Sequence, residues 1–208
     1  MNILLEAQYL PSIQYLSKFY LYDKVIIDDL EVFEKQSYRN RSIICGANGP
    51  IDLIIPVHSS RKRLPIREIE IDNHNNWQHQ HWQSIKSAFG KTPFFEHYAH
   101  KFELIFNKPY QKLFDFDLDL LIIILKILKI DESKLILTSQ TNEIDFVDFK
   151  NKIHPKLKFQ GIDNDFKIIR YSQAFEEKLG FIPNLSIIDA VFNSGINCLN
   201  LFIKYKTL

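Results

Sequence analysis

The chain has 208 residues, of which 46% are hydrophobic and 25% are charged, and its formal net charge is +1. This length and composition are those of an ordinary globular domain, so we expect one domain over residues 1–208. The balanced charge excludes the broad basic surface by which many proteins bind nucleic acids. With no recognised nucleic-acid-binding module visible, we expect no nucleic-acid partner.

The sequence predicts a cytoplasmic protein. Cys45 and Cys198 lie in apolar surroundings without C-x-x-C spacing, which is typical of reduced, buried thiols. The first residues carry Glu6 and Gln8 instead of a basic start and a long apolar core, so they do not read as a signal peptide. Two lysines interrupt the apolar segment at residues 118–130, which is shorter than the ~20 residues that cross a bilayer. We therefore expect a buried helix there and no transmembrane segment.

Hydrophobic periodicity predicts an α/β fold, with a small central, mostly parallel or mixed sheet from the N-terminal third and a helical C-terminal half. Pro11 suits the first turn of a helix, and Gly90 suits the end of another. Strands are expected at residues 2–7, 24–28, 42–45, 52–57, 66–71, 135–138 and 168–171. Helices are expected at residues 11–20, 77–89, 118–130, 172–179 and 186–193, with another starting at Thr92-Pro93. We also expect a basic surface loop at residues 59–63 and a polar helix or loop at residues 142–152.

Residues 35–41 read Lys-Gln-Ser-Tyr-Arg-Asn-Arg and follow soon after an apolar run that ends in two aspartates. Guanidinium groups bind carboxylates or phosphates through two parallel hydrogen bonds, so this density of donors is typical of an anion-binding site. A solvated strand edge also explains the cations, because lysine and arginine protect such edges from pairing. Asn40 between two arginines is not needed for edge protection. We therefore predict that Lys35, Arg39, Asn40 and Arg41 bind a small anionic molecule.

Two further positions are candidates for catalysis. Asp28, followed by Asp29, ends an apolar strand, where open α/β sheets place ligand-binding groups, although a simple strand-end turn explains the same residues. His81 lies on the apolar stripe of its predicted helix between Trp77 and Ile85, where a histidine is commonly a core residue. It is also the best-placed general base, because an unperturbed histidine has a pKa of about 6.5. We predict Asp28 and His81 as the catalytic residues.

The sequence predicts no metal site and identifies no cofactor. His79 and His81 point to different faces of a helix, and His97-x-x-His100 lacks a nearby cysteine or an H-E-x-x-H arrangement. The chain contains no G-x-G-x-x-G, Walker or G-x-S-x-G motif. Its 6 glycines are too few for a glycine-rich phosphate loop.

A series of short motifs extends over about residues 3–196. In chain order they are Gln8-Tyr9 before Pro11 with Gln14-Tyr15 following, residues 35–41, Leu53-x-x-Pro56-Val57, Trp77…His81-Trp82-x-x-Ile85, Thr92-Pro93-Phe94-Phe95-Glu96, Tyr171-Ser172-Gln173-x-Phe175, and Leu185-Ser186-Ile187-Ile188-Asp189…Phe192-Asn193-x-Gly195. Their order resembles the WbqC-like protein family, in the form common among Bacteroidetes. Two places depart from the expected pattern. Gln8-Tyr9-Leu10-Pro11-Ser12 replaces Tyr-Phe-Pro-Pro, and Lys150 replaces an arginine after Asp148.

The resemblance implies a role in the biosynthesis of surface polysaccharide (O-antigen), where the roles proposed for the family are sugar-modifying. We expect an acyl- or aminoacyl-transferring enzyme, or a ligase-like one, that acts on a nucleotide-linked amino sugar. In this hypothesis Lys35, Arg39 and Arg41 neutralise phosphates, Asn40 orients the substrate and His81 is the base. The partner is then a small anionic molecule such as a nucleotide-sugar.

The alternative is a non-catalytic scaffold or regulatory protein of envelope biosynthesis. The abundance of aromatic residues, 13% of the chain, and the lack of an evident nucleophile are compatible with it. The cations would then form internal ion pairs, for example with Asp28, Asp29 or Glu31. A structure separates the two hypotheses, because it shows whether Arg39 and Arg41 line an open pocket or pair with protein carboxylates.

The order of the predicted strands and loops along the chain indicates where the site should lie. The loop after the first strand and the start of the cationic segment should emerge at the same edge of the sheet, where α/β folds place their ligands. We expect one concave surface there, formed by Gln8, Tyr9, Arg39, Asn40, Arg41 and His81.

Overall fold

The structure is a computed structural model that describes residues 1–58, 63–141, 145–156, 158 and 160–203. At its centre is a parallel sheet with the strand order β5-β2-β1-β6. The strands are β1 (Asn2–Leu5), β2 (Lys24–Ile27), β5 (Leu135–Leu137) and β6 (Val147–Asp148). β1 and β2 end in three consecutive buried apolar residues, as expected of parallel strands that are covered on both faces.

The helix α1 (Ile13–Leu21) connects β1 to β2. Ser12 caps this helix, because its Oγ accepts a hydrogen bond from the backbone N–H of Tyr15. Leu16 and Phe19 are fully buried and fix the helix to the core. The strand–helix–strand unit therefore holds the loop at residues 6–12 at the carboxyl end of β1.

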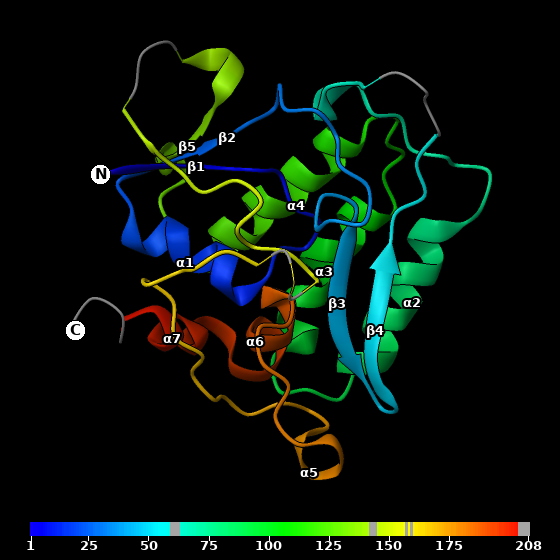
Figure 1. Cartoon of the computed structure of the whole chain (residues 1–208). Helices are drawn as coiled ribbons and strands as arrows, with labels where there is room; N and C mark the ends of the chain where they lie inside the picture. The colour runs from blue at the N-terminus through cyan, green and yellow to red at the C-terminus, as the bar shows by residue number, and fades with distance from the viewer. Residues whose placement is uncertain (59–62, 142–144, 157, 159, 204–208) are drawn as a thin grey trace.

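The strands β3 (Arg41–Gly46) and β4 (Gly49–Ile54) form an antiparallel hairpin outside the parallel sheet. Gly49 has a φ of 123°, which residues with a Cβ rarely adopt, so glycine is needed to close the turn. Figure 1 shows the hairpin on the other side of the molecule from β1, β2 and β5.

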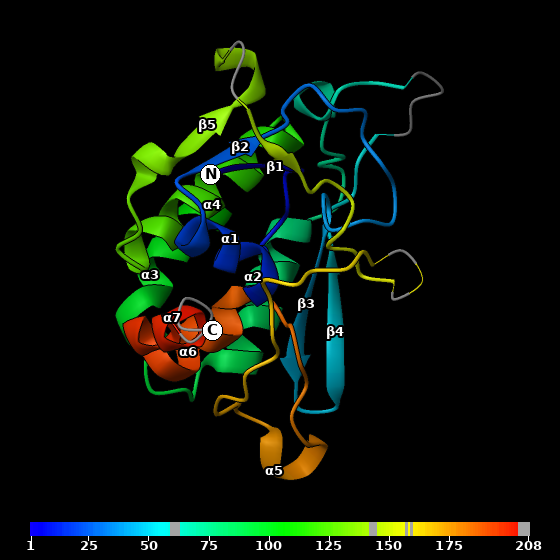
Figure 2. The same cartoon turned by 60° about the vertical axis from the view of Figure 1, so that its left-hand side comes forward.

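The remainder of the chain is mainly helical. The elements are α2 (Trp77–Phe89), α3 (Phe95–Phe106), α4 (Leu113–Ile127), α5 (Glu176–Leu179), α6 (Ile187–Ser194) and α7 (Asn200–Ile203), with 3-10 turns at Ile66–Glu68, Glu132–Lys134, Thr138–Gln140 and Gly195–Leu199. α2 packs on β3, and α3 packs on α4 (Figures 1 and 2). Phe192 of α6 contacts Phe89, Phe95 and Phe102 at ring-centroid distances of 5.3, 5.1 and 5.4 Å. One cluster of buried side chains joins these helices to the sheet.

The predicted α/β class, with a parallel central sheet and a helical C-terminal half, is confirmed. Several local predictions were wrong. Residues 66–71 form a 3-10 turn and isolated bridges instead of a strand, and residues 168–171 form no strand. The sheet takes its edge strands from β5 and β6, and β6 lies in the segment expected to be a polar helix or loop.

Residues 59–62 of the expected basic loop and residues 142–144 lie outside the described residues. Within the described ranges, none of the helices combines the length and the low polarity that a bilayer crossing requires.

Candidate functional site

Polar residues that follow four strands gather at one edge of the parallel sheet. Glu6 follows β1, Asp28 and Asp29 follow β2, Ser139 follows β5, and Lys150 and Asn151 follow β6. The backbone N–H of Asn151 donates to Glu6 Oε2 at 2.9 Å, and Ser139 Oγ donates to Asp29 Oδ2 at 2.7 Å. Lys150 Nζ donates to Asp28 Oδ2 at 2.5 Å. The carboxyl ends of parallel strands meet at one edge, so these residues, with Glu31 and Arg39 described next, form a single sheet-edge cluster.

Arg39 lies in the sheet-edge cluster and binds a protein carboxylate. Its Nε and Nη2 donate to the two carboxylate oxygens of Glu31 at 2.7 and 2.6 Å, and Nη2 also donates to Asn151 Oδ1 at 2.9 Å. Arg39 is only 2% exposed. Burial raises the pKa of Glu6 and of Glu31 above the usual value, although the charge of Arg39 opposes this rise. For Arg39, the internal ion pair of the alternative hypothesis is therefore present, with Glu31 as the partner.

The other cationic and amide residues of the 35–41 segment have different surroundings. Lys35 is exposed, whereas Asn40 Nδ2 donates to the backbone carbonyl of Ile55 at 2.9 Å and holds the end of the hairpin. Arg41 is partly exposed, and its Nη1 lies 3.8 Å from Asp52 on the neighbouring strand. Its buried Nε has no hydrogen-bond partner among the described residues. Within residues 35–41, Arg39 therefore belongs to the sheet-edge cluster, Asn40 stabilises the end of the hairpin, and Lys35 lies at the surface.

His81 and Tyr9 form a buried pair between α2 and the loop after β1. The Tyr9 hydroxyl lies 3.0 Å from His81 Nδ1, and the two rings stack with their centroids 5.7 Å apart. Trp77 packs edge-on against His81 at 5.3 Å, and a hydrogen bond links the imidazole to the backbone of Ile54. Burial lowers the pKa of His81 to about 4. This value is far below the near-neutral pKa that favours a general base, so it lends no support to the predicted role of His81 as the base.

We expect the free energy of unfolding to fall as the pH is lowered from 7 to 4. His81 takes up a proton near pH 6.5 in the unfolded chain but only near pH 4 in the folded protein, so acid favours the unfolded state in this window. The shift corresponds to about 3 kcal/mol. Chemical denaturation of the protein and of His81→Gln across this range measures the effect, because ionisations common to both cancel in the difference. His79→Gln, which changes an exposed histidine of the same helix, is the control. A pH-independent difference between the protein and His81→Gln would contradict the assignment.

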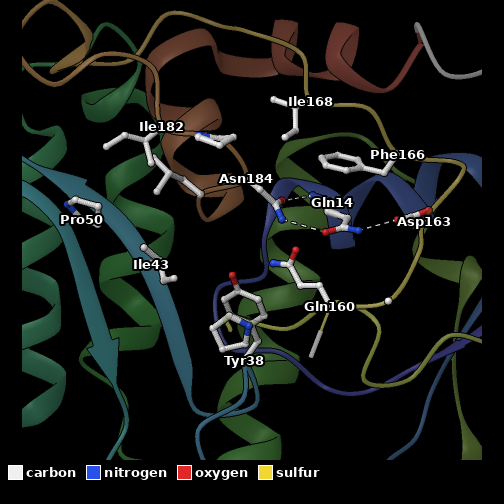
Figure 3. Close-up of a pocket in the computed structure, with 14 residues that line it drawn as sticks. Gln14, Tyr38, Ile43, Pro50, Gln160, Asp163, Phe166, Ile168, Ile182 and Asn184 are labelled. Carbon is white, nitrogen blue, oxygen red and sulfur yellow. Dashed lines mark hydrogen bonds between the residues drawn. The ribbon is translucent and has the colours of Figure 1, made fainter. Parts of the chain in front are cut away.

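A pocket of about 520 Å³ lies beside the first turn of α1 (Figure 3). Residues of α1, Tyr38, the hairpin, Pro155 and the chain segments 160–168 and 182–185 surround it. Its polar lining consists of Gln14, Tyr38, Gln160, Asp163 and Asn184, and its apolar lining includes Ile43, Pro50, Pro155, Phe166, Ile168, Ile182, Pro183 and Leu185. We call this space the α1 pocket.

Hydrogen bonds fix the polar side of the α1 pocket. The backbone N–H of Gln14 donates to Asn184 Oδ1, and Asn184 Nδ2 donates to Gln14 Oε1, each at 3.0 Å. Gln14 Nε2 in turn donates to Asp163 Oδ2 at 2.8 Å (Figure 3). Lys18, which is fully buried in α1, donates to Asp163 Oδ1 at 2.6 Å. The four side chains hold one another in place, so a ligand meets groups that are already oriented.

Tyr38 supplies a hydroxyl to the same space. Figure 3 shows this hydroxyl directed into the pocket, on the side of the Gln160 and Asn184 amides. Burial raises the pKa of Tyr38 to about 12, so the hydroxyl stays protonated at neutral pH and can both donate and accept a hydrogen bond.

Arg41 lies close to the hairpin side of the α1 pocket. Residues two apart on a strand point to the same side, so Arg41 shares a face of β3 with Ile43, which lines the pocket. The positive charge of Arg41 also acts to lower the pKa of Tyr38, against the larger effect of burial. The α1 pocket thus combines amide and phenol groups, the Asp163 carboxylate and an apolar wall with a cation near its border.

None of the five polar lining residues was predicted as a site residue. Gln14 belongs to the Gln14-Tyr15 motif of the family resemblance, and Asn184 directly precedes the motif that begins at Leu185. Gln160 and Asp163 lie in a segment without any motif. Among the described residues, no group of three or more His, Cys, Asp and Glu side chains is arranged to hold a metal ion.

The fold and these sites define an α/β protein with polar loops at the carboxyl edge of a parallel sheet and a preformed pocket beside the first helix. The model of the WbqC-like protein family matches residues 6–148, more than half of the sequence, and the chain belongs to this family. The match includes the loop after β1, the hairpin and the strands β2, β5 and β6, whereas β1 lies before it and Gln160, Asp163 and Asn184 lie beyond it. Membership is consistent with a role related to polysaccharide biosynthesis. Neither a curated protein nor a solved structure gave a match.

Proposed function

We propose that this protein acts in the biosynthesis of surface polysaccharide (O-antigen) and modifies a nucleotide-linked amino sugar by acyl transfer, aminoacyl transfer or a ligase-like reaction. The sugar occupies the α1 pocket. The observation that carries the proposal is the convergence of the Tyr38 hydroxyl with the amides of Gln14, Gln160 and Asn184 on one pocket with an apolar wall.

The α1 pocket has the size and chemistry that a sugar ring requires. Its volume of about 520 Å³ lies within the range of about 300–1,000 Å³ that is usual for small-molecule sites. Sugar hydroxyls both donate and accept hydrogen bonds, and amide groups and a phenol can donate to them and accept from them. The C–H faces of the ring need an apolar surface, which Ile43, Phe166 and Ile182 offer.

Arg41 is the residue that we assign to the phosphates of the nucleotide. It is partly exposed, its ion pair with Asp52 is long at 3.8 Å, and its buried Nε lacks a partner among the described residues. Lys35, which is exposed, can add to the positive charge. Arg39 is not part of the proposal, because Glu31 already occupies its guanidinium. His81 and Asp28 are held in internal contacts, so the proposal assigns them no step.

Calorimetric titration tests this arrangement with UDP-N-acetylglucosamine as the probe and with UDP as the sugar-free comparison. Tyr38→Phe and Asn184→Ala should each weaken binding of the nucleotide-sugar by about 2- to 10-fold, the effect of one lost hydrogen bond, and leave UDP binding unchanged. Arg41→Ala should weaken both probes alike, because it acts on the phosphates. Gln80→Ala, a change at an exposed site on α2, is the control. Binding that none of the three pocket variants alters would contradict the assignment.

A non-catalytic scaffold or regulatory protein remains the second candidate function. The observation in its favour is that Arg39 and His81, which were expected to bind ligand and to act as the base, are both buried in internal contacts. A protein that binds neither UDP-N-acetylglucosamine nor UDP, yet is retained by other proteins of envelope biosynthesis, would support this candidate over the enzyme.

A further inference from the structure

A second large pocket, of about 630 Å³, lies at the turn between α2 and α3. The end of α2, this turn, the tip of the hairpin, the chain just ahead of α5 and the end of α6 surround it. It shares no lining residue with the α1 pocket. We call this space the α2–α3 pocket.

Three of the motifs noted in the sequence meet at the α2–α3 pocket. Thr92 and Pro93 begin one motif, Phe175 ends another, and Asn193 belongs to the last. These residues lie far apart in the sequence, and the proposed function uses none of them. Their convergence on one hollow is the reason for asking what this pocket binds.

Contacts between the segments hold the α2–α3 pocket open. The backbone N–H of Phe94 donates to the carbonyl of Phe192 at 3.0 Å, which fixes the turn between α2 and α3 against α6. Lys178 Nζ of α5 donates to the carbonyl of Ala47 at 2.8 Å and holds the tip of the hairpin beside α5 (Figures 1 and 2). The walls are therefore in place before a ligand arrives, which lowers the cost of binding.

The α2–α3 pocket offers one free positive charge. Lys91 is exposed and forms no ion pair among the described residues, whereas Lys86 is paired with Glu103 at 2.9 Å. Ser87 adds an exposed hydroxyl that can donate a hydrogen bond. None of the described residues that line the pocket is Asp or Glu. The charge of Lys91 is thus left for an anionic group of a ligand.

The rest of the lining accepts an uncharged, mainly apolar body. Asn193 Nδ2 donates to the carbonyl of Asp189 at 2.8 Å, so the amide oxygen of Asn193 is left as an acceptor. The apolar part of the wall consists of Ala47, Ala88, Pro93, Ala174 and Phe175. An ammonium group on the ligand would find no carboxylate among these residues. One free lysine also suits the single charge of a carboxylate better than the two charges of a phosphate monoester.

We propose that the α2–α3 pocket binds a small carboxylic acid that has a compact apolar body and no ammonium group. The carboxylate pairs with Lys91, and the apolar body lies on Pro93, Ala174 and Phe175. This binding site does not depend on the sugar in the α1 pocket, and its test contains no nucleotide.

NMR titration of the full-length, ¹⁵N-labelled protein tests the proposal with three probes that share one carbon skeleton. They are 3-phenylpropanoate, its uncharged amide 3-phenylpropanamide, and phenylalanine, which adds an ammonium group. We expect 3-phenylpropanoate to bind with a Kd on the order of 1 mM and to shift the amide signals of residues 87–92, 174 and 175. The amide and phenylalanine should each bind about 5-fold more weakly. Equal affinity of either for the pocket, or shifts confined to residues of the α1 pocket, would overturn the proposal.

Two variants and one control locate the contacts. Lys91→Gln should weaken binding of 3-phenylpropanoate by about 2- to 5-fold and leave that of the amide unchanged, because it removes only the charge. Ala174→Phe, at an exposed position, should fill the pocket and weaken both probes by about 10-fold or more. Lys101→Gln, which removes an exposed lysine of α3, should change neither. Affinity for 3-phenylpropanoate that survives Lys91→Gln intact, or falls equally in Lys101→Gln, would contradict the assignment.

Discussion

Replacing Arg39 by alanine is expected to lower the free energy of unfolding by about 3–5 kcal/mol. The guanidinium makes three hydrogen bonds of 2.6–2.9 Å to Glu31 and Asn151, and its removal leaves the Glu31 carboxylate buried without a counterion. Glu6 also loses a favourable charge. The loss should be smaller at pH 5 than at pH 8, because the pKa of Glu31 rises further without Arg39 and protonation then relieves the buried charge. Urea denaturation at the two pH values measures both effects.

Arg41→Ala is the matched control for Arg39→Ala. Arg41 lies two residues away and has an ion pair of its own, but that pair is long and partly exposed, so its loss should change stability by less than about 1 kcal/mol. Arg39→Lys keeps the charge and loses the two-pronged geometry, and its stability should fall between those of the protein and of Arg39→Ala. Equal destabilisation by Arg39→Ala and Arg41→Ala would show that burial does not decide the strength of these pairs.

Lys18→Met is expected to destabilise the protein by an amount of similar size, about 3–5 kcal/mol. Lys18 is fully buried, pairs with Asp163 at 2.6 Å, and holds its ammonium 4.7 Å from the centre of the Phe149 ring. Methionine preserves most of the apolar stem. The loss of stability therefore arises from the missing charge and from the Asp163 carboxylate, which is left without its counterion. Denaturant unfolding provides the measurement.

A double-mutant cycle with Asp163→Asn isolates the pair. The double variant should be more stable than the sum of the two single losses predicts, because the partner of each removed charge is then also neutral. Lys126→Met is the control, since its pair with Glu132 is exposed and should contribute less than about 1 kcal/mol. Additive losses in the cycle would contradict a direct interaction between Lys18 and Asp163.

Elements with local signals could be predicted from the sequence. α2 begins and ends at the predicted residues, because its hydrophobic stripe is strong and Gly90 marks its end. The isoleucines at residues 66, 69 and 71 were misread as a strand. Ile66 and Ile69 are three residues apart, which is the repeat of the 3-10 turn that buries both. β6 has no local signal, because its two residues are exposed and form a strand only by pairing with β1.

For the candidate site, the sequence predicted which charged residues take part but not which of them pair with one another. The charges of Arg39, Asp28 and Glu31 were recognised, but the choice of Glu31 over Asp28 as the partner of Arg39 depends on how the loops fold together. The α1 pocket carries still less sequence signal. Gln14 and Asn184 are 170 residues apart in the sequence and meet only through the packing of α1 beside the chain ahead of α6.

The order of the strands determines when this sheet can be completed during synthesis. β1 and β2 are adjacent in the chain and can pair early, but the outer edge of each is covered by a strand from residues 135–148. Contacts between such distant segments form slowly, because the intervening chain must first be ordered. Both edges of the β1–β2 pair therefore stay open while most of the protein is being made, and open strand edges are where chains associate wrongly. The nascent chain should depend on chaperones during this interval, and a fragment that ends before β5 should aggregate.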